Sequence, residues 1–215
     1  MGSQYDVEVL SRSAVFAGIE PDEACALLDN LGAFTRRYEA GSYIRRKGDI
    51  LDFYPVIMEG RVQASMPEGG QDHFVSEFKT GDSFAEAIPS TIKNSPVNMY
   101  VVEDTTLLCI PAVRLDACNE PCAETIRLNL KGELSKKLGI LIRALRVLSE
   151  PRLTDRILSY LDTLPANPDG SKTVPFSRMD WAGYLRVADK SLIRELRKMQ
   201  DDGLIEVDGR NIKVM

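Results

Sequence analysis

The sequence predicts an α+β fold, and three observations support this. Between about residues 33 and 110, short segments rich in β-branched and aromatic residues alternate with turn signals, which is typical of an antiparallel sheet. After Pro121 the apolar residues recur every three or four positions, as they do on one face of a helix. The end of the chain combines two short helical patterns with a hairpin. The whole chain of 215 residues is long enough for one large or two modest domains. Its composition, 44% apolar and 27% charged, excludes a largely disordered chain.

The first half predicts one helix followed by many strands. Pro21 suits the first turn of a helix, and Asp22 and Glu23 lie near the positive end of its dipole. From Ala33 the period changes to two, and strands are expected at residues 43–45, 53–58, 61–66, 73–78, 98–102 and 106–110. Many short strands at this spacing indicate an antiparallel sandwich or barrel.

A leucine seam follows Pro121. It consists of Leu134, Leu138, Leu141, Leu145 and Leu148, which are separated by 4, 3, 4 and 3 residues. This is the spacing of a coiled coil. The seam is explained either by a helix that packs on its own domain or by a parallel helix pair in a homodimer. Pro151 ends this helix, a further helix is expected at 152–164, and residues 165–171 form a turn-rich loop.

Two short helices joined by a tight turn are expected next. The first covers residues 179–185, and Asp189 is a good N-cap for the second, which Gly203 ends. The second helix has apolar residues at Leu192, Ile193, Leu196 and Met199. It also carries Lys190, Ser191, Arg194, Arg197 and Lys198. This pattern makes a helix-turn-helix candidate, in which the second helix fits the major groove of DNA.

A hairpin follows this helix pair. Asp208-Gly209 separates two alternating segments, 204–207 and 210–214, and predicts a type I′ turn with positive φ at both central residues. A helix-turn-helix with a hairpin describes a winged helix. The combination favours DNA binding over the alternative of an ordinary solvated cationic face.

The charge is unevenly distributed. Residues 1–120 carry 10 Lys/Arg and 19 Asp/Glu, residues 121–150 carry 6 and 3, and residues 151–215 carry 11 and 10. An acidic front half and a neutral-to-basic rear half suggest two modules with different partners. Any DNA contact must therefore come from a few well-placed cations in the rear half.

Several classes of protein are disfavoured. No apolar run is long enough to cross a bilayer, and no secretory signal is visible, so we expect a soluble, cytoplasmic protein without a membrane partner. Four cysteines are too few for a disulfide scaffold. A single histidine and the lack of a phosphate-cradling glycine loop argue against an enzyme.

The chain resembles the Crp–Fnr family of bacterial transcription regulators from about Val15 to Val214. The resemblance rests on segments 41–44, 47–49, 56–62, 81–86, 151–158 and 178–205, taken in this order. It implies a β-roll (jelly-roll-like) effector-sensing domain at 1–120, a dimerisation helix at 121–150 and a winged helix-turn-helix DNA-binding domain at 151–215. It implies a homodimer on a palindromic DNA operator and allows RNA polymerase as a partner.

The effector implied by the cyclic-AMP-binding relatives does not suit this chain. Those relatives hold the ribose phosphate with a Gly-Glu pair and an Arg-Ser pair, where this chain has Ala85-Glu86 and Val97-Asn98. Without the arginine, a desolvated phosphate would lack a cation, which costs several kcal/mol. Glu86 is either a remnant of this site or a structural acceptor for loop amides.

We therefore expect an unidentified effector other than cyclic AMP; the alternative is a cyclic nucleotide held by an atypical phosphate clamp. Relatives place hydroxyl residues on the dimer helix, where this chain has Leu141 and Ile142. The expected pocket residues are Phe84, Ala85, Glu86, Ala87, Val97, Asn98, Met99, Leu138, Leu141 and Ile142.

No metal or resident cofactor is expected. The oxygen-sensing branch of the family needs closely spaced N-terminal cysteines for an iron–sulfur cluster, and this chain has only Cys25 there. Cys118 and Cys122 are interpreted as ordinary thiols, with a redox pair as the alternative. His73 alone is a poor haem ligand.

By resemblance, bases are read by Asp189, Lys190 and Arg194 with Ser191 nearby. The full set of expected DNA contacts is Arg178, Asp189, Lys190, Ser191, Arg194 and Lys198. Relatives often have Arg-Glu where this chain has Asp189-Lys190, so the usual operator sequence is in doubt. The alternative to a DNA-binding regulator is a ligand-binding protein whose winged helix serves protein interaction.

Overall fold

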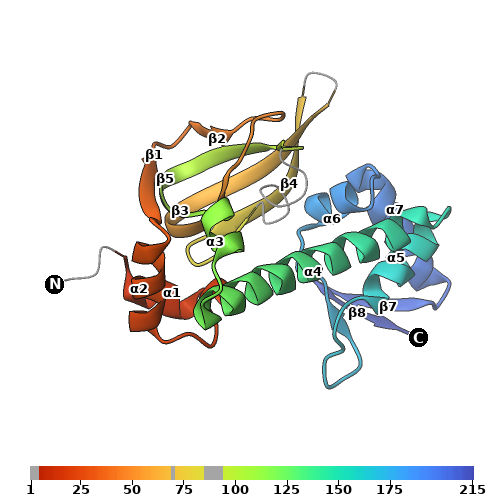
Figure 1. Cartoon of the computed structure of the whole chain (residues 1–215). Helices are drawn as coiled ribbons and strands as arrows, with labels where there is room; N and C mark the ends of the chain where they lie inside the picture. The colour runs from red at the N-terminus through yellow and green to blue at the C-terminus, as the bar shows by residue number, and fades with distance from the viewer. Residues whose placement is uncertain (1–4, 69–70, 85–93) are drawn as a thin grey trace. The chain divides into compact units, whose positions relative to one another are not determined.

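A computed structural model of the chain describes residues 5–68, 71–84 and 94–215 (Figure 1). It confirms the α+β class. The chain divides into two compact units, residues 1–136 and 137–215. The boundary falls inside the long helix α4, Pro121–Ser149, so the helix that we predicted as a separate segment is shared between both units.

Unit 1 is built on an antiparallel sheet of five strands in the order β1-β5-β3-β4, with β2 also paired to β5 (Figure 1). The strands are β1 Phe34–Tyr38, β2 Tyr43–Arg45, β3 Phe53–Glu68, β4 Gln71–Lys79 and β5 Asn98–Pro111. The expected strands 53–58 and 61–66 are one long strand, and so are 98–102 and 106–110.

The two long strands pair with each other through several irregularities. Register shifts between β3 and β5 occur after Ile57, Glu59 and Arg61. Such bulges bend a strand and increase its twist without ending it. One bent strand therefore replaces the two shorter strands that we predicted. The turn residues Glu59-Gly60 that suggested a break therefore lie at a bulge within β3.

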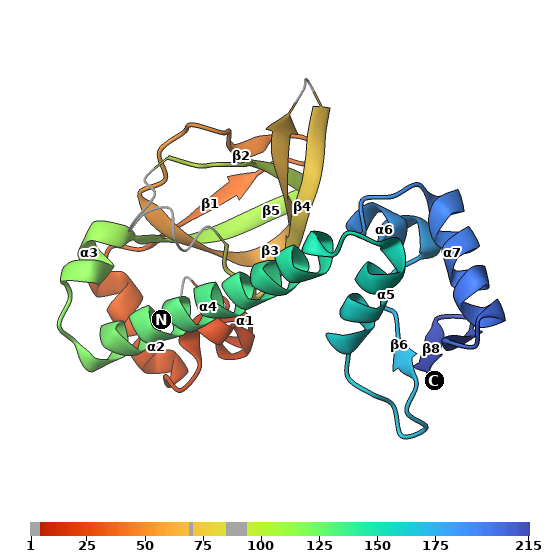
Figure 2. The same cartoon turned by 90° about the vertical axis from the view of Figure 1, so that its right-hand side faces the viewer.

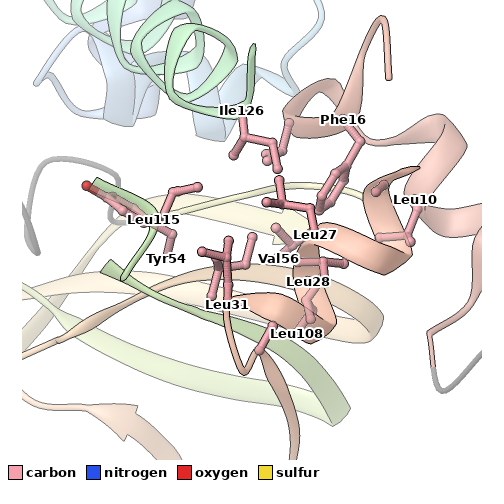
Figure 3. Packing of buried hydrophobic residues seen from close by; sticks show 14 of the residues in the cluster. Leu10, Phe16, Leu27, Leu28, Leu31, Tyr54, Val56, Leu108, Leu115 and Ile126 are labelled. Carbon is pink, nitrogen blue, oxygen red and sulfur yellow. The ribbon is translucent and has the colours of Figure 1, made fainter. Parts of the chain in front are cut away.

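Helices cover one part of this sheet. They are α1 Val7–Arg12, the 3-10 turn η1 Ala14–Phe16, α2 Pro21–Asn30 and α3 Ala112–Ala117. Figure 3 shows Leu27 and Leu28 of α2 between Phe16 and the strand residues Val56 and Leu108. This cluster forms the main core of unit 1.

The first half of α4 belongs to the same core. Ala123, Ile126 and Leu130 are buried in it. Arg127 donates from Nη1 to the carbonyl oxygens of Leu115 and Cys118, at 2.6 and 2.7 Å. Apolar packing and hydrogen bonds therefore both hold this half of the helix in unit 1.

Besides the second half of α4, unit 2 contains three helices and a small antiparallel sheet (Figure 2). The helices are α5 Leu153–Asp162, α6 Arg178–Tyr184 and α7 Asp189–Asp201. The strands are β6 Lys172–Thr173, β7 Ile205–Asp208 and β8 Asn211–Val214, in the order β6-β8-β7. Tyr160 and Trp181 lie at the centre of the core, with their ring centroids 5.5 Å apart.

The hairpin turn differs from the prediction by one residue. Asp208 pairs with Asn211, so the two-residue loop is Gly209-Arg210 rather than Asp208-Gly209. Only Gly209 has a positive φ, 56°, as in a turn with glycine at its first central position. The type I′ prediction is therefore wrong, because the strand pairing extends through Asp208.

Candidate nucleic-acid interface and effector site

The helix-turn-helix of unit 2 consists of α6, a short turn and α7 (Figure 2). The buried side chains of Trp181, Leu185 and Leu192 join the two helices. Arg186 lies in the turn with a φ of 54°, the one positive value among the non-glycine residues that the structure describes. A side chain in this left-handed region costs about 1–2 kcal/mol, which the packing of the helix pair must offset.

Helix α7 is divided into a buried face and a charged face. Leu192, Leu196 and Met199 are buried, as their spacing predicts, whereas Ile193 is exposed. The exposed basic side chains are Lys190, Arg194, Arg197 and Lys198. The expected DNA contacts on this helix are therefore exposed, except for Ser191, which is half-buried.

Asp189 does not occupy the position we expected. The N-cap of α7 is Ala188, which makes no side-chain cap, and Asp189 is the first residue of the helix. Its carboxylate accepts a hydrogen bond from the backbone N–H of Lys190 at 2.8 Å. The acidic side chain thus stabilises the first turn, as an anion near a helix N-terminus does, although it is not the N-cap.

Arg178 is engaged within its own unit. Its Nη2 donates to the carbonyl oxygen of Gly209 at 2.5 Å, and its guanidinium lies 5.6 Å from the ring centre of Trp181. These contacts connect the start of α6 to the tip of the β7–β8 hairpin. Its expected role as a DNA contact stays a prediction, but the structure gives Arg178 a role in holding the hairpin.

A second set of polar contacts fixes the sheet beside the hairpin. The side chain of Thr173 in β6 donates to Asn211 in β8 at 2.8 Å and accepts from Asn167 at 3.0 Å. Asn167 also donates to Ser171 within the 165–171 loop, and its bond to Thr173 attaches this loop to the sheet. The hairpin is therefore supported from both the α6 side and the β6 side.

The second half of α4 presents the predicted leucine seam to solvent. Leu134, Leu138, Leu141 and Leu145 are between 37% and 57% exposed, and Leu148 is half-buried. In a single chain Leu138, Leu141 and Leu145 are left more than half exposed. This exposure favours the second of the two explanations for the seam, a partner helix.

The expected effector residues fall into three groups. Phe84 and Met99 are buried in a second core cluster of unit 1, against which the half-buried Val97 packs. Ala85, Glu86 and Ala87 lie outside the described residues. Leu138, Leu141 and Ile142 are exposed residues of α4 in unit 2. The pocket that they were expected to form together stays a prediction.

Asn98 has a clear local role. It is buried, and its Oδ1 accepts a hydrogen bond from the backbone N–H of Lys47 at 2.9 Å. Val97 precedes it, with its own carbonyl accepting from the Ser95 hydroxyl at 2.6 Å. Val97 and Asn98 are thus neutral residues that contribute to the local structure where β5 begins.

Two family models match successive parts of the chain. The model of the cyclic nucleotide-binding domain matches residues 35–120, and that of the Crp-like helix-turn-helix domain matches residues 152–215. The chain belongs to the Crp–Fnr family of transcription regulators. Both units of this Crp–Fnr regulator are covered in the expected order, with the long helix between the two matched segments.

Known proteins of similar sequence are regulators too. The transcriptional activator protein FnrA of Stutzerimonas stutzeri is 22% identical over 195 residues, which cover 87% of this chain and 79% of FnrA. Among solved structures, the c-di-GMP-responsive global regulator CLP of Xanthomonas campestris has a TM-score of 0.56 at 23% identity and covers 89% of this chain and 98% of its own. The catabolite activator protein of Thermus thermophilus has a TM-score of 0.52 at 19% identity and covers 94% of both chains. These structures support the fold.

The cysteines of this Crp–Fnr regulator are all free thiols. Cys122 donates to the carboxylate of Glu23 at 3.6 Å, and partial burial and this carboxylate raise the pKa of its thiol. A raised pKa disfavours the reactive thiolate. The interpretation of Cys118 and Cys122 as ordinary thiols stays a prediction, and a redox pair stays the alternative.

The described residues offer neither a metal site nor a membrane-spanning helix. In residues 5–68, 71–84 and 94–215 no group of three or more His, Cys, Asp or Glu side chains is arranged to hold a metal ion. Over the same part of the chain, no helix has the length and apolar character needed to span a membrane.

Two features of the helix-turn-helix were missed from the sequence, the positive φ of Arg186 and the exposure of Ile193. Arg186 gave no signal, because glycine or asparagine is the residue expected at positive φ. Ile193 fits the spacing of a buried stripe, so its exposure follows only from the way α7 packs on α5 and α6.

Proposed function

We propose that this regulator acts as a homodimer that binds a palindromic DNA operator through α7 and responds to a small effector other than cyclic AMP. The observation that carries the proposal is the two-faced character of α7. Its apolar face is buried against the rest of unit 2, and its basic face is open to solvent. A helix of this kind, next to a hairpin wing, fits the major groove.

Within this helix, Lys190 and Arg194 are the strongest base-reading candidates. Both are exposed, and they are four residues apart, so they lie on the same side of the helix in its N-terminal half. Lysine and arginine donate to the O6 and N7 acceptors of guanine. Since the Asp189 carboxylate already accepts from the helix backbone, we assign Asp189 a positioning role for the first turn.

The exposed seam of α4 supports the homodimer. Four leucines with coiled-coil spacing are solvent-exposed in one chain, and pairing with the same stripe of a second chain would bury them. A two-fold symmetric dimer presents two copies of α7, and a palindromic operator matches this symmetry.

The neutral pair Val97-Asn98 supports an effector without a phosphate clamp of the usual kind. Asn98 is buried and bonded to the backbone of Lys47, so it is committed to the local fold. A phosphate placed there would be desolvated with no cation from these two positions, at a cost of several kcal/mol.

DNA binding is tested by selection from a random duplex library followed by gel shifts, with the chain alone and with cyclic AMP, cyclic GMP or cyclic di-GMP. The last probe is included because CLP is described as responsive to c-di-GMP. We expect an enriched palindrome. Arg194→Ala should lose about 1–3 kcal/mol of discrimination at one base pair per half-site. Arg37→Ala, an exposed arginine of unit 1, should bind like wild type.

Three results would contradict this proposal. If Arg194→Ala lowered the affinity for all DNA sequences equally, Arg194 would be a phosphate contact and not a base-reading residue. The lack of any enriched sequence under all four conditions would favour a protein-interaction role for the winged helix. Micromolar binding of cyclic AMP in calorimetry would overturn the interpretation of Val97-Asn98 and favour an atypical phosphate clamp.

A further inference from the structure

Ile193 stands apart from the other apolar residues of α7. Leu192, Leu196 and Met199 are at most 5% exposed, whereas Ile193 in the middle of the same helix is 53% exposed. A single exposed apolar residue on a protein surface needs no explanation by itself. Its significance depends on which side of the helix it lies and on what surrounds it.

The surroundings of Ile193 are cationic. Lys190 precedes it by three residues and Arg197 follows it by four, so both flank it on the helix surface, and both are exposed. Arg194 is the next residue and is exposed as well. The side chain of Ile193 is therefore the apolar member of the surface through which we propose that α7 contacts DNA.

The opposite side of α7 is occupied by the protein itself. Glu195 is half-buried and accepts a hydrogen bond from the hydroxyl of Thr154 in α5. This contact ties one side of α7 to the body of unit 2. The side that carries Ile193 is left as the accessible one, because α7 cannot turn about its axis without breaking that contact and the buried packing.

The chemistry of the major groove then limits what Ile193 can contact. The base edges present hydrogen-bond donors and acceptors, and the one apolar group among them is the C5 methyl of thymine. An isoleucine placed against a guanine or cytosine edge would desolvate polar groups and offer them no partner. Against a thymine methyl, the same side chain removes apolar surface from water on both partners.

We propose that Ile193 contacts the C5 methyl of one thymine in each half-site, next to the base pair contacted by Lys190 or Arg194. This inference rests on the proposed DNA-binding function and deepens it. It gives the operator a feature that the basic residues alone do not specify, a required thymine beside a pair read by a cation. Ile193 thus becomes a specificity-determining residue.

The test removes the methyl group from the DNA. In the selected operator, each thymine is replaced in turn by deoxyuridine, symmetrically in both half-sites, and affinities are measured with the four effector conditions used above. One replacement should weaken wild-type binding about fourfold per half-site, the effect expected for losing one buried methyl group. Thymines outside the contact should tolerate the replacement.

Variants of the protein complete a cycle with this change in the DNA. Ile193→Ala should weaken binding to the thymine operator and make it insensitive to the deoxyuridine replacement, and Ile193→Val should keep part of the sensitivity. Leu204→Ala is the matched control, because Leu204 is an exposed apolar residue of the same unit that lies beyond the C-terminal end of α7. It should keep the full sensitivity. Thermal unfolding followed by Trp181 fluorescence shows that each variant is folded.

The outcomes separate this inference from the function on which it rests. If a specific operator is found but no thymine is sensitive to loss of its methyl group, the role of Ile193 is wrong and the proposed function stands. The same holds if a thymine is sensitive and Ile193→Ala retains that sensitivity. If no specific operator is found under any condition, the proposed function fails and this inference fails with it.

Discussion

Gly60 occupies a position in β3 where no larger residue fits without displacing the neighbouring strand. Its φ is +96°, and a Cβ built on it would lie 2.3 Å from the carbonyl oxygen of Asp104 and 2.8 Å from the Cα of Thr105. Both obstacles are backbone atoms of β5, which cannot rotate away. The glycine therefore permits the close approach of β3 and β5 at their bulge.

We predict that Gly60→Ala lowers the free energy of unfolding of unit 1 by more than the roughly 1–2 kcal/mol that positive φ alone costs. Gly18→Ala is the control, because Gly18 also has a positive φ, 79°, but a Cβ there would meet open space. Hydrogen exchange of the β3 amides measures the difference. Equal losses for the two variants would mean that β5 yields at this point and the contact is unimportant.

Tyr160 is expected to make unit 2 less stable at alkaline pH. Its burial raises the pKa of the hydroxyl to about 12, whereas in an unfolded chain this pKa is about 10. Above pH 10 the unfolded state has lost a proton that the folded state retains. Stability is therefore fully present below about pH 10 and falls as pH rises toward 12.

Tyr160→Phe should flatten this alkaline decrease, because phenylalanine has no proton to lose. The wild-type slope attributable to Tyr160 is up to about 1.4 kcal/mol per pH unit within this window. Trp181 is the single tryptophan of the chain and lies 5.5 Å from Tyr160, so denaturation followed by its fluorescence reports on unit 2. Parallel pH profiles for wild type and variant would contradict the assignment.

Helix α4 changes its environment along its length. Its first half is packed into unit 1, and the leucines of its second half are exposed in the single chain. The apolar residues of that half extend beyond the seam, because Ile140 is as exposed as Leu141. Ile140 does not have the three- and four-residue spacing that relates the seam residues, so it lies off their side of the helix. Substitutions at Leu141 and at Ile140 therefore distinguish a specific helix pair from non-specific hydrophobic association.

We predict that Leu141→Lys converts the dimer into a monomer, because two lysines would face each other across the seam. Ile140→Lys is the matched control on the same helix and should leave the dimer intact. Sedimentation velocity at micromolar concentration distinguishes the two. A monomeric wild-type chain, or loss of the dimer in both variants, would show that the seam is not the interface.

The periodic elements were predictable from the sequence and the short ones were not. Helix α2 begins at Pro21 as expected, and α6 and α7 lie within one or two residues of the predicted bounds. Helices α1 and α3 have six residues each and β6 has two, which is too short for a period to appear. The division of β3 and β5 into shorter strands was wrong, because a bulge looks like a turn in sequence.

The candidate site shows the same limit. The spacing of Lys190, Arg194 and Lys198 was enough to place basic residues on one exposed helix. The bond from Arg178 to Gly209 joins residues 31 apart, and no local pattern announces such a contact. Likewise, Ile193 and Leu192 have similar apolar side chains, and only the packing of α7 decides which one is buried.

At the scale of the whole molecule, the charge distribution sets how this regulator meets DNA. Residues 1–120 carry nine more acidic than basic side chains, and residues 151–215 are nearly neutral. The acidic residues 1–120 repel the phosphate backbone of DNA. The few exposed cations of α7 must bind DNA in spite of this repulsion. A single winged helix would bind weakly under these conditions, so affinity should depend on both copies of α7 engaging the duplex together.

This dependence predicts a strict requirement for half-site spacing. If the dimer presents two α7 helices to successive major grooves, the half-site centres are about 10–10.5 base pairs apart. Inserting five base pairs at the centre of the operator rotates one half-site by half a turn, and the affinity should fall to that of an isolated half-site. Leu141→Lys should bind both spacings equally weakly, because a monomer engages one half-site at a time. If the insertion did not change the affinity of the wild-type chain, its two winged helices would act independently. If Leu141→Lys still discriminated the two spacings, the dimer contact would lie outside the seam.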